Sequence, residues 1–268
     1  MAMSGKDLVK FLGTAGARFV VARQLRYSAG TFLSLGGKAI MLDPGPGTLT
    51  RCAASRPKID ATKLDALILT HGHIDHSNDV NILIDAMTGG GLERRGHLFA
   101  PAECLEGPHK VLLDYLRDFP TSIVALQAES DYELDGVRFS TSARHHHPAE
   151  TYGVKFHRSA GLVSFLPDTE YFDGLAESYA GSDVLVVNVV RLEPHQSVRI
   201  MHLTLEEAER VIGEVHPRRA VLTHFGMTML RAKPHELAAA MSDRLGLEVL
   251  AARDGMTLGL DPEPNGVS

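Results

Sequence analysis

One short segment constrains this chain more than any other, the run THGHIDH at residues 70–76. It directly follows a continuous apolar run at residues 66–69, which is typical of a strand buried on both faces. Residues 78–87 then carry apolar side chains at helical spacing. The sequence therefore predicts a buried strand, then a turn that carries four side chains able to bind metal, then a helix.

The spacing of these four side chains predicts two cation sites. Alternate residues of an extended chain share a face, so His71 and His73 can point at one ion. Asp75 and His76 come where the chain must already be turning, so they can face a second ion nearby. The alternative is a histidine-rich surface loop, but the position between a buried strand and a helix favours metal binding, as do the 14 histidines of the chain.

Short apolar runs bounded by glycine and proline turns predict strands in both halves of the chain. They are expected at residues 8–12, 31–35, 39–42, 66–69, 137–142, 152–156, 162–166, 184–189 and 220–222. A capping box formed by Thr204 and Glu207 predicts a second helix that ends near residue 216. This pattern indicates two packed sheets with helices outside, in a single domain over residues 1–268, with residues 261–268 expected to fray.

The HxHxDH motif at the end of a strand resembles the signature of the metallo-β-lactamase superfamily, and later motifs extend the resemblance over nearly the whole chain. Asp43, in LDPGPG, matches an aspartate that orients the metal loop without being a ligand. His147, Asp168 and His224 match, in turn, the third histidine of the first site, the aspartate that bridges both metals and the last histidine of the second site. The resemblance implies an α/β fold of four layers, αββα, in which helices flank two packed mixed sheets.

The resemblance also implies which residues hold each ion. One ion would be bound by His71, His73 and His147, the other by Asp75, His76 and His224, and Asp168 would lie between the two. Ligand sets rich in imidazole suit zinc and leave positions open for water, so we expect two divalent ions, zinc first, with Mn²⁺ and iron as alternatives. A water between two such ions ionises near neutral pH and becomes the attacking hydroxide. The chain is therefore predicted to be a metal-dependent hydrolase.

The third histidine of the first site is open to more than one assignment, because residues 145–147 are all histidine. In an extended strand His145 and His147 face one side and His146 faces the other. The sequence PAETYG that follows His147 fits the family pattern, so His147 is the predicted ligand. His145 remains the alternative.

Further features separate the branches of this superfamily, whose fold hosts many activities. Asp168 disfavours true β-lactamases, which lack the bridging aspartate, and the chain leaves little room for the flavodoxin-like domain of the oxygen reductases. The segment from His147 to Gly153 and the sequence MHLT at residues 201–204 resemble the phosphodiesterase branch typified by ribonuclease Z, which carries His-x-Thr before a helix. We predict Asp75 and His202 as catalytic, with His202 donating a hydrogen bond or proton to the phosphate or leaving group. Alternatively, His202 merely precedes the helix on the surface.

The substrate is predicted to be small. The net charge of −6 argues against a broad grip on long nucleic acid. The chain also shows no insertion like the basic Gly/Pro-rich arm with which ribonuclease Z recognises its substrate. We therefore favour a small or nucleotide-type phosphodiester. The alternative is hydrolysis of a carbonyl substrate, a lactone or thioester, on the same metal centre, and a scaffold without metals is disfavoured by the intact ligand set.

The rest of the chain gives weaker signals. Arg191, His195 and Arg199 lie between Asp168 and His202 without an assigned role. Other histidines have no motif around them and are interpreted as surface or packing residues: His97, His109, His157, His195, His216 and His235. The sequence lacks a signal peptide and an apolar run of membrane-spanning length, which predicts a soluble cytoplasmic protein without a membrane partner. A homodimer is left open.

Overall fold

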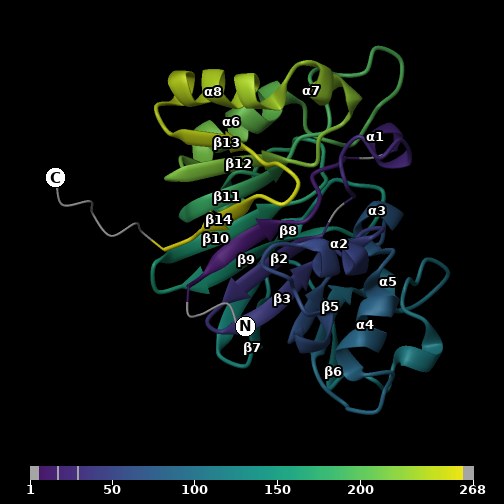
Figure 1. Ribbon diagram of the computed structural model, residues 1–268. Helices are drawn as coiled ribbons and strands as arrows, with labels where there is room; N and C mark the ends of the chain where they lie inside the picture. Colours follow the sequence, from purple (N-terminus) through teal and green to yellow (C-terminus); the bar gives the residue numbers. More distant parts are fainter. Residues whose placement is uncertain (1–5, 17, 29, 262–268) are drawn as a thin grey trace.

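The computed structural model describes residues 6–16, 18–28 and 30–261, and its strands form two seven-stranded sheets (Figure 1). In the first sheet the strand order is β14-β1-β2-β3-β4-β5-β6. Its strands are β1 (Leu8–Phe11), β2 (Thr31–Leu35), β3 (Lys38–Leu42), β4 (Ala66–Ile68), β5 (His97–Pro101), β6 (Ser122–Leu126) and β14 (Thr257–Gly259). In the second sheet the order is β13-β12-β11-β10-β9-β8-β7. Its strands are β7 (Asp131–Leu134), β8 (Val137–Arg144), β9 (Tyr152–Arg158), β10 (Gly161–Leu166), β11 (Ser182–Asn188), β12 (Arg219–Thr223) and β13 (Glu248–Ala251).

Both sheets are mixed, as predicted. Strands β14, β1, β2 and β3 pair antiparallel, whereas β3, β4, β5 and β6 run parallel. In the second sheet β7 to β10 pair antiparallel and β10 to β13 run parallel. The continuous apolar runs of β4 and β11 belong to these parallel parts, where helices cover the outer face of a strand and the other sheet covers its inner face.

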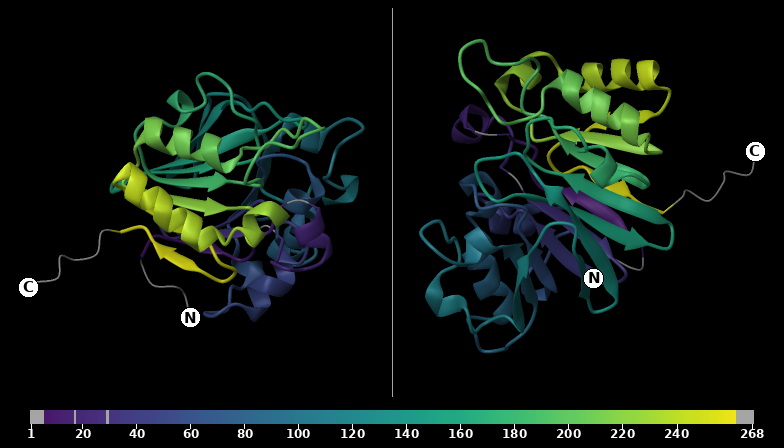
Figure 2. Two further views of the ribbon diagram at one scale, coloured as in Figure 1. Left: turned by 90° about the horizontal axis from the view of Figure 1, so that it is seen from above. Right: turned by 180° about the vertical axis from the view of Figure 1, so that it is seen from behind.

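Helices cover the outer face of each sheet (Figures 1 and 2). The α-helices are α1 (Phe19–Ala22), α2 (Thr48–Ala54), α3 (Ile74–Ser77), α4 (Val80–Thr88), α5 (Ala102–Leu105), α6 (Leu205–Val215), α7 (Met227–Arg231) and α8 (Pro234–Leu245). Short 3₁₀ turns are η1 (Ala61–Lys63), η2 (Asp114–Leu116) and η3 (Glu177–Tyr179). Helices α2, α4 and α5 lie on the side of the first sheet, and α6 and α8 lie on the side of the second.

Three apolar clusters hold these layers together. One lies between the sheets and contains Phe11 from β1, Phe139 from β8 and Phe156 from β9. A second joins the first sheet to α4, and a third joins the second sheet to α6 and α8. The order helix, sheet, sheet, helix confirms the predicted αββα architecture.

The structure differs from the sequence prediction at several elements. The helix expected at residues 78–87 begins at Val80, and the one-turn helix α3 already starts inside the histidine motif. The elements that were not predicted are strands β5, β6, β7, β13 and β14 and helices α1, α2, α5, α7 and α8. Of these strands, all but β5 lie at the edges of the two sheets. Edge strands are only partly buried, so they carry a weak apolar pattern.

No helix within the described residues is long and apolar enough to cross a membrane. Apart from Asp261, the segment predicted to fray at residues 261–268 lies outside the described residues. A single domain over residues 1–268 stays a prediction.

Candidate metal centre

The histidine motif leaves β4 at its carboxyl end and turns at once into α3. His73 is the residue before the helix, and the Ser77 hydroxyl donates to the carbonyls of Gly72 and His73, 3.0 Å from each oxygen. This closes the turn and directs the side chains of His71, Asp75 and His76 into the protein, where all three residues are buried. The turn predicted between the pair His71 and His73 and the pair Asp75 and His76 is therefore the first turn of helix α3.

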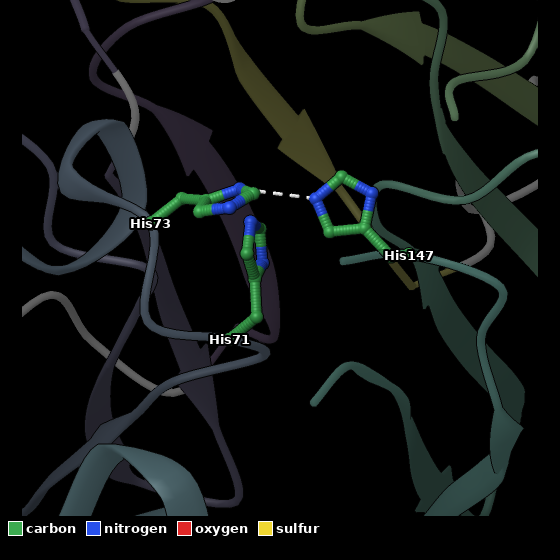
Figure 3. A group of neighbouring side chains, drawn as sticks. All are labelled: His71, His73 and His147. Carbon is green, nitrogen blue, oxygen red and sulfur yellow. Dashed lines mark hydrogen bonds between the residues drawn. The ribbon is translucent and has the colours of Figure 1, made fainter. Parts of the chain in front are cut away.

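The structure brings His147 to His71 and His73, although it follows a strand of the other sheet (Figure 3). The Nε2 atom of His147 lies 3.0 Å from Nδ1 of His73, and its Nδ1 lies 3.0 Å from the carbonyl oxygen of Met201. Because a carbonyl only accepts hydrogen bonds, Nδ1 of His147 carries the proton and Nε2 turns its lone pair toward His73. At His71, Nδ1 contacts the Thr70 hydroxyl at 3.1 Å, and Nε2 points to the centre and has no hydrogen-bond partner in the described part of the chain. We call these three histidines the first group.

A second group contains Asp75, His76 and His224. The Nε2 atoms of His76 and His224 lie 2.9 Å apart, and Oδ2 of Asp75 lies 3.4 Å from Nε2 of His224. Behind His76, Oδ2 of Asp43 lies 3.0 Å from Nδ1. Asp43 also accepts hydrogen bonds from the backbone N–H and the hydroxyl of Thr70, both at 2.7 Å. Asp43 thus contacts both His76 and Thr70, and its role in orienting the metal loop stays a prediction.

Two residues at this centre have left-handed backbone conformations. Asp43 directly follows β3 with φ of 49°, and His224 directly follows β12 with φ of 60°. Residues other than glycine rarely adopt such angles, and they cluster at functional sites. Beside His224, Gly16 leaves no room for a side chain, since a Cβ there would lie 2.2 Å from the His224 carbonyl oxygen. The backbone at Asp43 and at His224 thus has an uncommon conformation on both sides of the second group.

Asp168 lies between the two groups, two residues beyond the end of β10. Its Oδ2 is 3.8 Å from Nε2 of His71 and 3.4 Å from Nε2 of His76. Its Oδ1 accepts a hydrogen bond from the side-chain amide of Asn188 at 2.9 Å and lies 3.4 Å from Nδ1 of His224. One carboxylate therefore lies beside both groups, and its role as a bridging ligand stays a prediction.

The donor atoms of the centre fit divalent cations. Among the described residues, five buried side-chain polar atoms have no hydrogen-bond partner, and only Ser28 Oγ lies outside the centre. The other four are His71 Nε2, Asp75 Oδ2, His202 Nδ1 and His224 Nδ1. Leaving such an atom unpaired costs about 1–3 kcal/mol, so their convergence favours a site for cations. The set consists of imidazole nitrogens and carboxylate oxygens, which suits zinc.

Charges within the centre perturb its pKa values in opposite directions. Burial lowers the pKa of His71 well below its usual value and that of His147 to about 4. Burial also opposes the charged form of His76, but the carboxylates of Asp75 and Asp168 outweigh it and raise the pKa well above the usual value. Burial alone would raise the pKa of Asp168, yet the surrounding imidazoles of His224, His202 and His76 hold it well below its normal range. Asp168 is thus a buried anion surrounded by imidazoles.

The other two consecutive histidines are not part of the first group. Both ring nitrogens of the buried His145 contact protein atoms, Nε2 at 2.8 Å from the Tyr179 hydroxyl and Nδ1 at 3.3 Å from the Asp168 carbonyl oxygen. His146 is exposed, and its ring stacks on Phe172 with centroids 4.2 Å apart. The geometry thus places His147 at the predicted position, and its role as a ligand stays a prediction.

His202 lies against the centre, just before the capped helix α6. Its Nε2 is 3.1 Å from Oδ2 of Asp168, and only 15% of its side chain is exposed, so it is not a surface residue. Burial lowers its pKa, but the Asp168 carboxylate outweighs this and raises the pKa overall. Both hydrogen bonds of the predicted capping box between Thr204 and Glu207 are present.

None of the six histidines interpreted as ordinary residues belongs to these groups in the described part of the chain. The stretch before His202 is tied to the centre by an ion pair between Arg199 and Glu170.

Sequence reasoning missed several supporting residues. Asn188 holds Asp168, and the Met201 carbonyl holds His147. Asn188 had a detectable signal, because it is a polar residue at the end of the apolar run of β11, as His71 is after β4. The Met201 carbonyl had none, since any residue provides a carbonyl.

Comparison with known proteins places this geometry among described folds. Residues 38–225 match the sequence model of a family described as beta-lactamase superfamily domain. An uncharacterised protein of Methanocaldococcus jannaschii is 28% identical, with 93% of this chain and 94% of that protein covered. The ribonuclease Z of Nocardia farcinica is 26% identical, with 97% and 99% covered. The crystal structure of the metallo-β-lactamase fold protein YhfI from Bacillus subtilis superimposes with a TM-score of 0.76 at 20% identity, covering 95% of this chain and 99% of that one.

Proposed function

The chain belongs to the β-lactamase superfamily. We propose that it is a phosphodiesterase with two metal ions and that its substrate is a small or nucleotide-type phosphodiester. It is a hydrolase of the metallo-β-lactamase fold and resembles the ribonuclease Z branch. This fold implies divalent metal ions, and we propose two zinc ions. The first group (His71, His73 and His147) would hold one ion and the second group (Asp75, His76 and His224) the other, with Asp168 shared.

The residues of the centre would divide the work of hydrolysis. Two bound cations supply Lewis acidity and lower the pKa of a bound water. The Asp168 carboxylate, fixed by Asn188, keeps the two groups at a constant separation. Asp75 has an oxygen without a hydrogen-bond partner among the described residues, and this oxygen can orient the attacking water. His202 donates to the phosphate or to the leaving oxygen.

The position of His202 carries this proposal. Hydrolysis of a phosphodiester builds negative charge on the non-bridging and leaving oxygens, and a nearby imidazole can offset that charge or deliver a proton. Nε2 of His202 lies 3.1 Å from Oδ2 of Asp168, so the carboxylate favours a proton on this nitrogen. The Nδ1 atom of His202 is buried and has no hydrogen-bond partner among the described residues, so the protein leaves its hydrogen-bonding capacity unused.

We expect His202→Ala to keep the fold and both metal ions and to lower kcat on phosphodiesters by roughly 10²–10⁴-fold, the range for losing a positioned acid or base. The loss should shrink with a nitrophenolate leaving group if His202 donates a proton, because such a group needs little protonation. A purely electrostatic role would show no dependence on leaving-group pKa. His235→Ala, which removes an exposed histidine outside the centre, is the matched control.

Two results would contradict the proposal. His202 also lies within ligand distance of His147 and Asp168, so loss of an ion in His202→Ala would make it a ligand instead. Unchanged rates on every phosphodiester would remove its catalytic role.

The alternative is a hydrolase of lactones or thioesters that uses the same centre. A carbonyl substrate has less need of the His202 imidazole, so His202→Ala should then have little effect. One screen of chromogenic phosphodiesters, lactones and thioesters separates these classes. A wild-type preference for lactones by orders of magnitude would overturn the phosphodiesterase proposal.

The size of the substrate is a further part of the proposal. Ribonuclease Z of Nocardia farcinica is a relative, and its name indicates an RNA substrate, but the net charge of −6 of this chain disfavours long nucleic acid. We therefore propose a short nucleotide or another small phosphodiester. Cytoplasmic location and a homodimer stay predictions.

A further inference from the structure

The segment of three consecutive histidines runs alongside the segment that begins with Asp168. Nδ1 of His145 lies 3.3 Å from the carbonyl oxygen of Asp168, and the backbone N–H of His146 donates to the Thr169 hydroxyl at 3.2 Å. The backbone N–H of Glu170 donates in return to the carbonyl of His146 at 3.0 Å. These contacts tie together two segments that each provide one proposed metal ligand.

The hydrogen bonds of His145 fix its tautomer. A carbonyl only accepts, so Nδ1 must carry the proton toward Asp168. The Nε2 atom is then an acceptor, and the Tyr179 hydroxyl at 2.8 Å must donate to it. A directed chain therefore runs from Tyr179 through His145 to the backbone of Asp168. His145 is 2% exposed and Tyr179 is 0% exposed, so water does not compete for these bonds.

The protein makes specific room for this pair. Tyr179 ends the 3₁₀ turn η3, and its hydroxyl lies beside Gly153 on β9. A Cβ at Gly153 would lie 1.7 Å from that hydroxyl oxygen, so any larger residue at position 153 would displace it. The glycine thus permits the contact on which the position of the His145 ring depends.

His145 also fixes the start of the loop that carries His147. Its backbone N–H donates to the carbonyl of Thr151 at 2.9 Å, and its own carbonyl accepts from the N–H of His147 at 3.1 Å. His145 is thus bonded to Asp168 through its side chain and to His147 through its backbone.

We propose that His145 and Tyr179 form a positioning pair that holds Asp168 and His147 in register, so that both reach the metal ions together. The inference rests on the proposed metal centre, and it gives the rejected ligand His145 a definite role. Among the described residues, the groups able to hold a metal ion include neither His145 nor Tyr179. Both act through the two ligands that they position.

Two substitutions of similar size separate positioning from packing. In His145→Asn the amide nitrogen can occupy the place of Nδ1 and donate to the Asp168 carbonyl. In His145→Gln the longer amide reaches the place of Nε2 and keeps only the Tyr179 contact. We expect the Asn variant, which keeps the Asp168 contact but loses the Tyr179 contact, to weaken metal binding no more than Tyr179→Phe does. The Gln variant should bind the two ions about 10–100-fold more weakly than the wild type, the range for losing a group that orients a ligand.

The measurement is a titration of the metal-free protein with Co²⁺ and Zn²⁺, which reads affinity and the Co²⁺ absorption spectrum without any turnover. Thermal unfolding of the same variants reports packing. His157→Gln, an exposed histidine on β9, is the matched control and should leave metal affinity unchanged. Tyr179→Phe keeps the ring and removes the hydroxyl, and it should weaken metal binding by less than His145→Gln.

Equal metal affinity in the Asn and Gln variants, with equally lowered Tm, would show a packing role only and overturn the inference. If His145→Gln does not fold, Tyr179→Phe decides: weakened metal binding supports the pair, and unchanged binding rejects it. Failure of the proposed function would give a different result. The metal affinities of the His145 and Tyr179 variants would then differ as expected, but no phosphodiester would be cleaved. A wild-type protein without metal affinity rejects both.

Discussion

The two groups of the candidate centre differ in charge. The first group consists of three imidazoles, and the groups that hold His71 and His147 are neutral, the Thr70 hydroxyl and the Met201 carbonyl. The second group includes the Asp75 carboxylate, and a further carboxylate, Asp43, contacts His76 from behind. The same fold thus builds one neutral ligand set and one anionic ligand set around the shared Asp168.

The pKa directions show the consequence of this difference. Burial lowers the pKa values of His71 and His147, whereas at His76 the carboxylates around the ring together outweigh burial and raise the pKa. An environment that stabilises a proton on His76 also stabilises a cation there. The second group contains the Asp75 carboxylate and has the Asp43 carboxylate behind His76, so it should bind its ion more tightly than the first.

The groups also differ in access. A recess of about 420 Å³ adjoins the first group and is lined by Arg144, His145, His146, His147, Glu170 and Met201. The second group instead borders a small cavity of about 40 Å³ between the sheets. We therefore expect substrate to approach past the first group, and we expect the ion there to exchange faster.

Removing one ligand from each group has the largest expected effect and tests whether the two groups hold separate ions. His147→Ala should lose the ion of the first group, and Asp75→Ala should lose the ion of the second. Each should lower kcat/KM by about 10³-fold or more, or ~4 kcal/mol of transition-state stabilisation, because hydrolysis needs both ions. Metal content by elemental analysis and kinetics on one phosphodiester measure both effects.

His146→Ala is the control within the same histidine run, because its side chain faces Phe172 and solvent. It should keep both ions and most activity. If His146→Ala strips metal and His147→Ala does not, the ligand register is wrong.

A smaller effect is expected from the carboxylate behind the second group. Asp43→Asn should weaken the tighter ion by about 10–100-fold and leave the first group nearly unchanged, because an orienting carboxylate makes its imidazole a better ligand. Asp79→Asn is the matched control, since Asp79 is also 8% exposed and bonds the backbone of Gly47 and Leu49 instead of a histidine. Selective weakening of the first group in Asp43→Asn would contradict the proposed asymmetry.

The position of a strand within its sheet, in the middle or at an edge, explains how much of the fold the sequence predicted. The nine strands expected from apolar runs are all present, because strands buried on both faces consist largely of apolar residues. The four edge strands β6, β7, β13 and β14 were missed, because each has only one neighbouring strand and much exposed surface. Helix α8 was missed as well, since small alanines in its middle give little apolar periodicity.

The candidate site divides in a similar way. Residues of local motifs, such as His71, His73, Asp75 and His76, could be predicted because their spacing alone determines which can share an ion. Asp168 and His224 needed the family resemblance, since each stands alone in its segment. The contacts of Asn188 and Tyr179 could not be predicted, because they depend on which strands become neighbours and on the space that Gly153 leaves.

We propose above all that seven residues form two metal sites of unequal affinity. The most direct test of this proposal is a metal titration of the chelator-treated wild-type protein, followed by stepwise removal with a competing chelator. We expect two ions per chain that leave in two steps. The first step, loss of the ion of the first group, should be absent in His147→Ala. Less than one ion per chain with metal supplied, or a single step that removes both ions together, would contradict it.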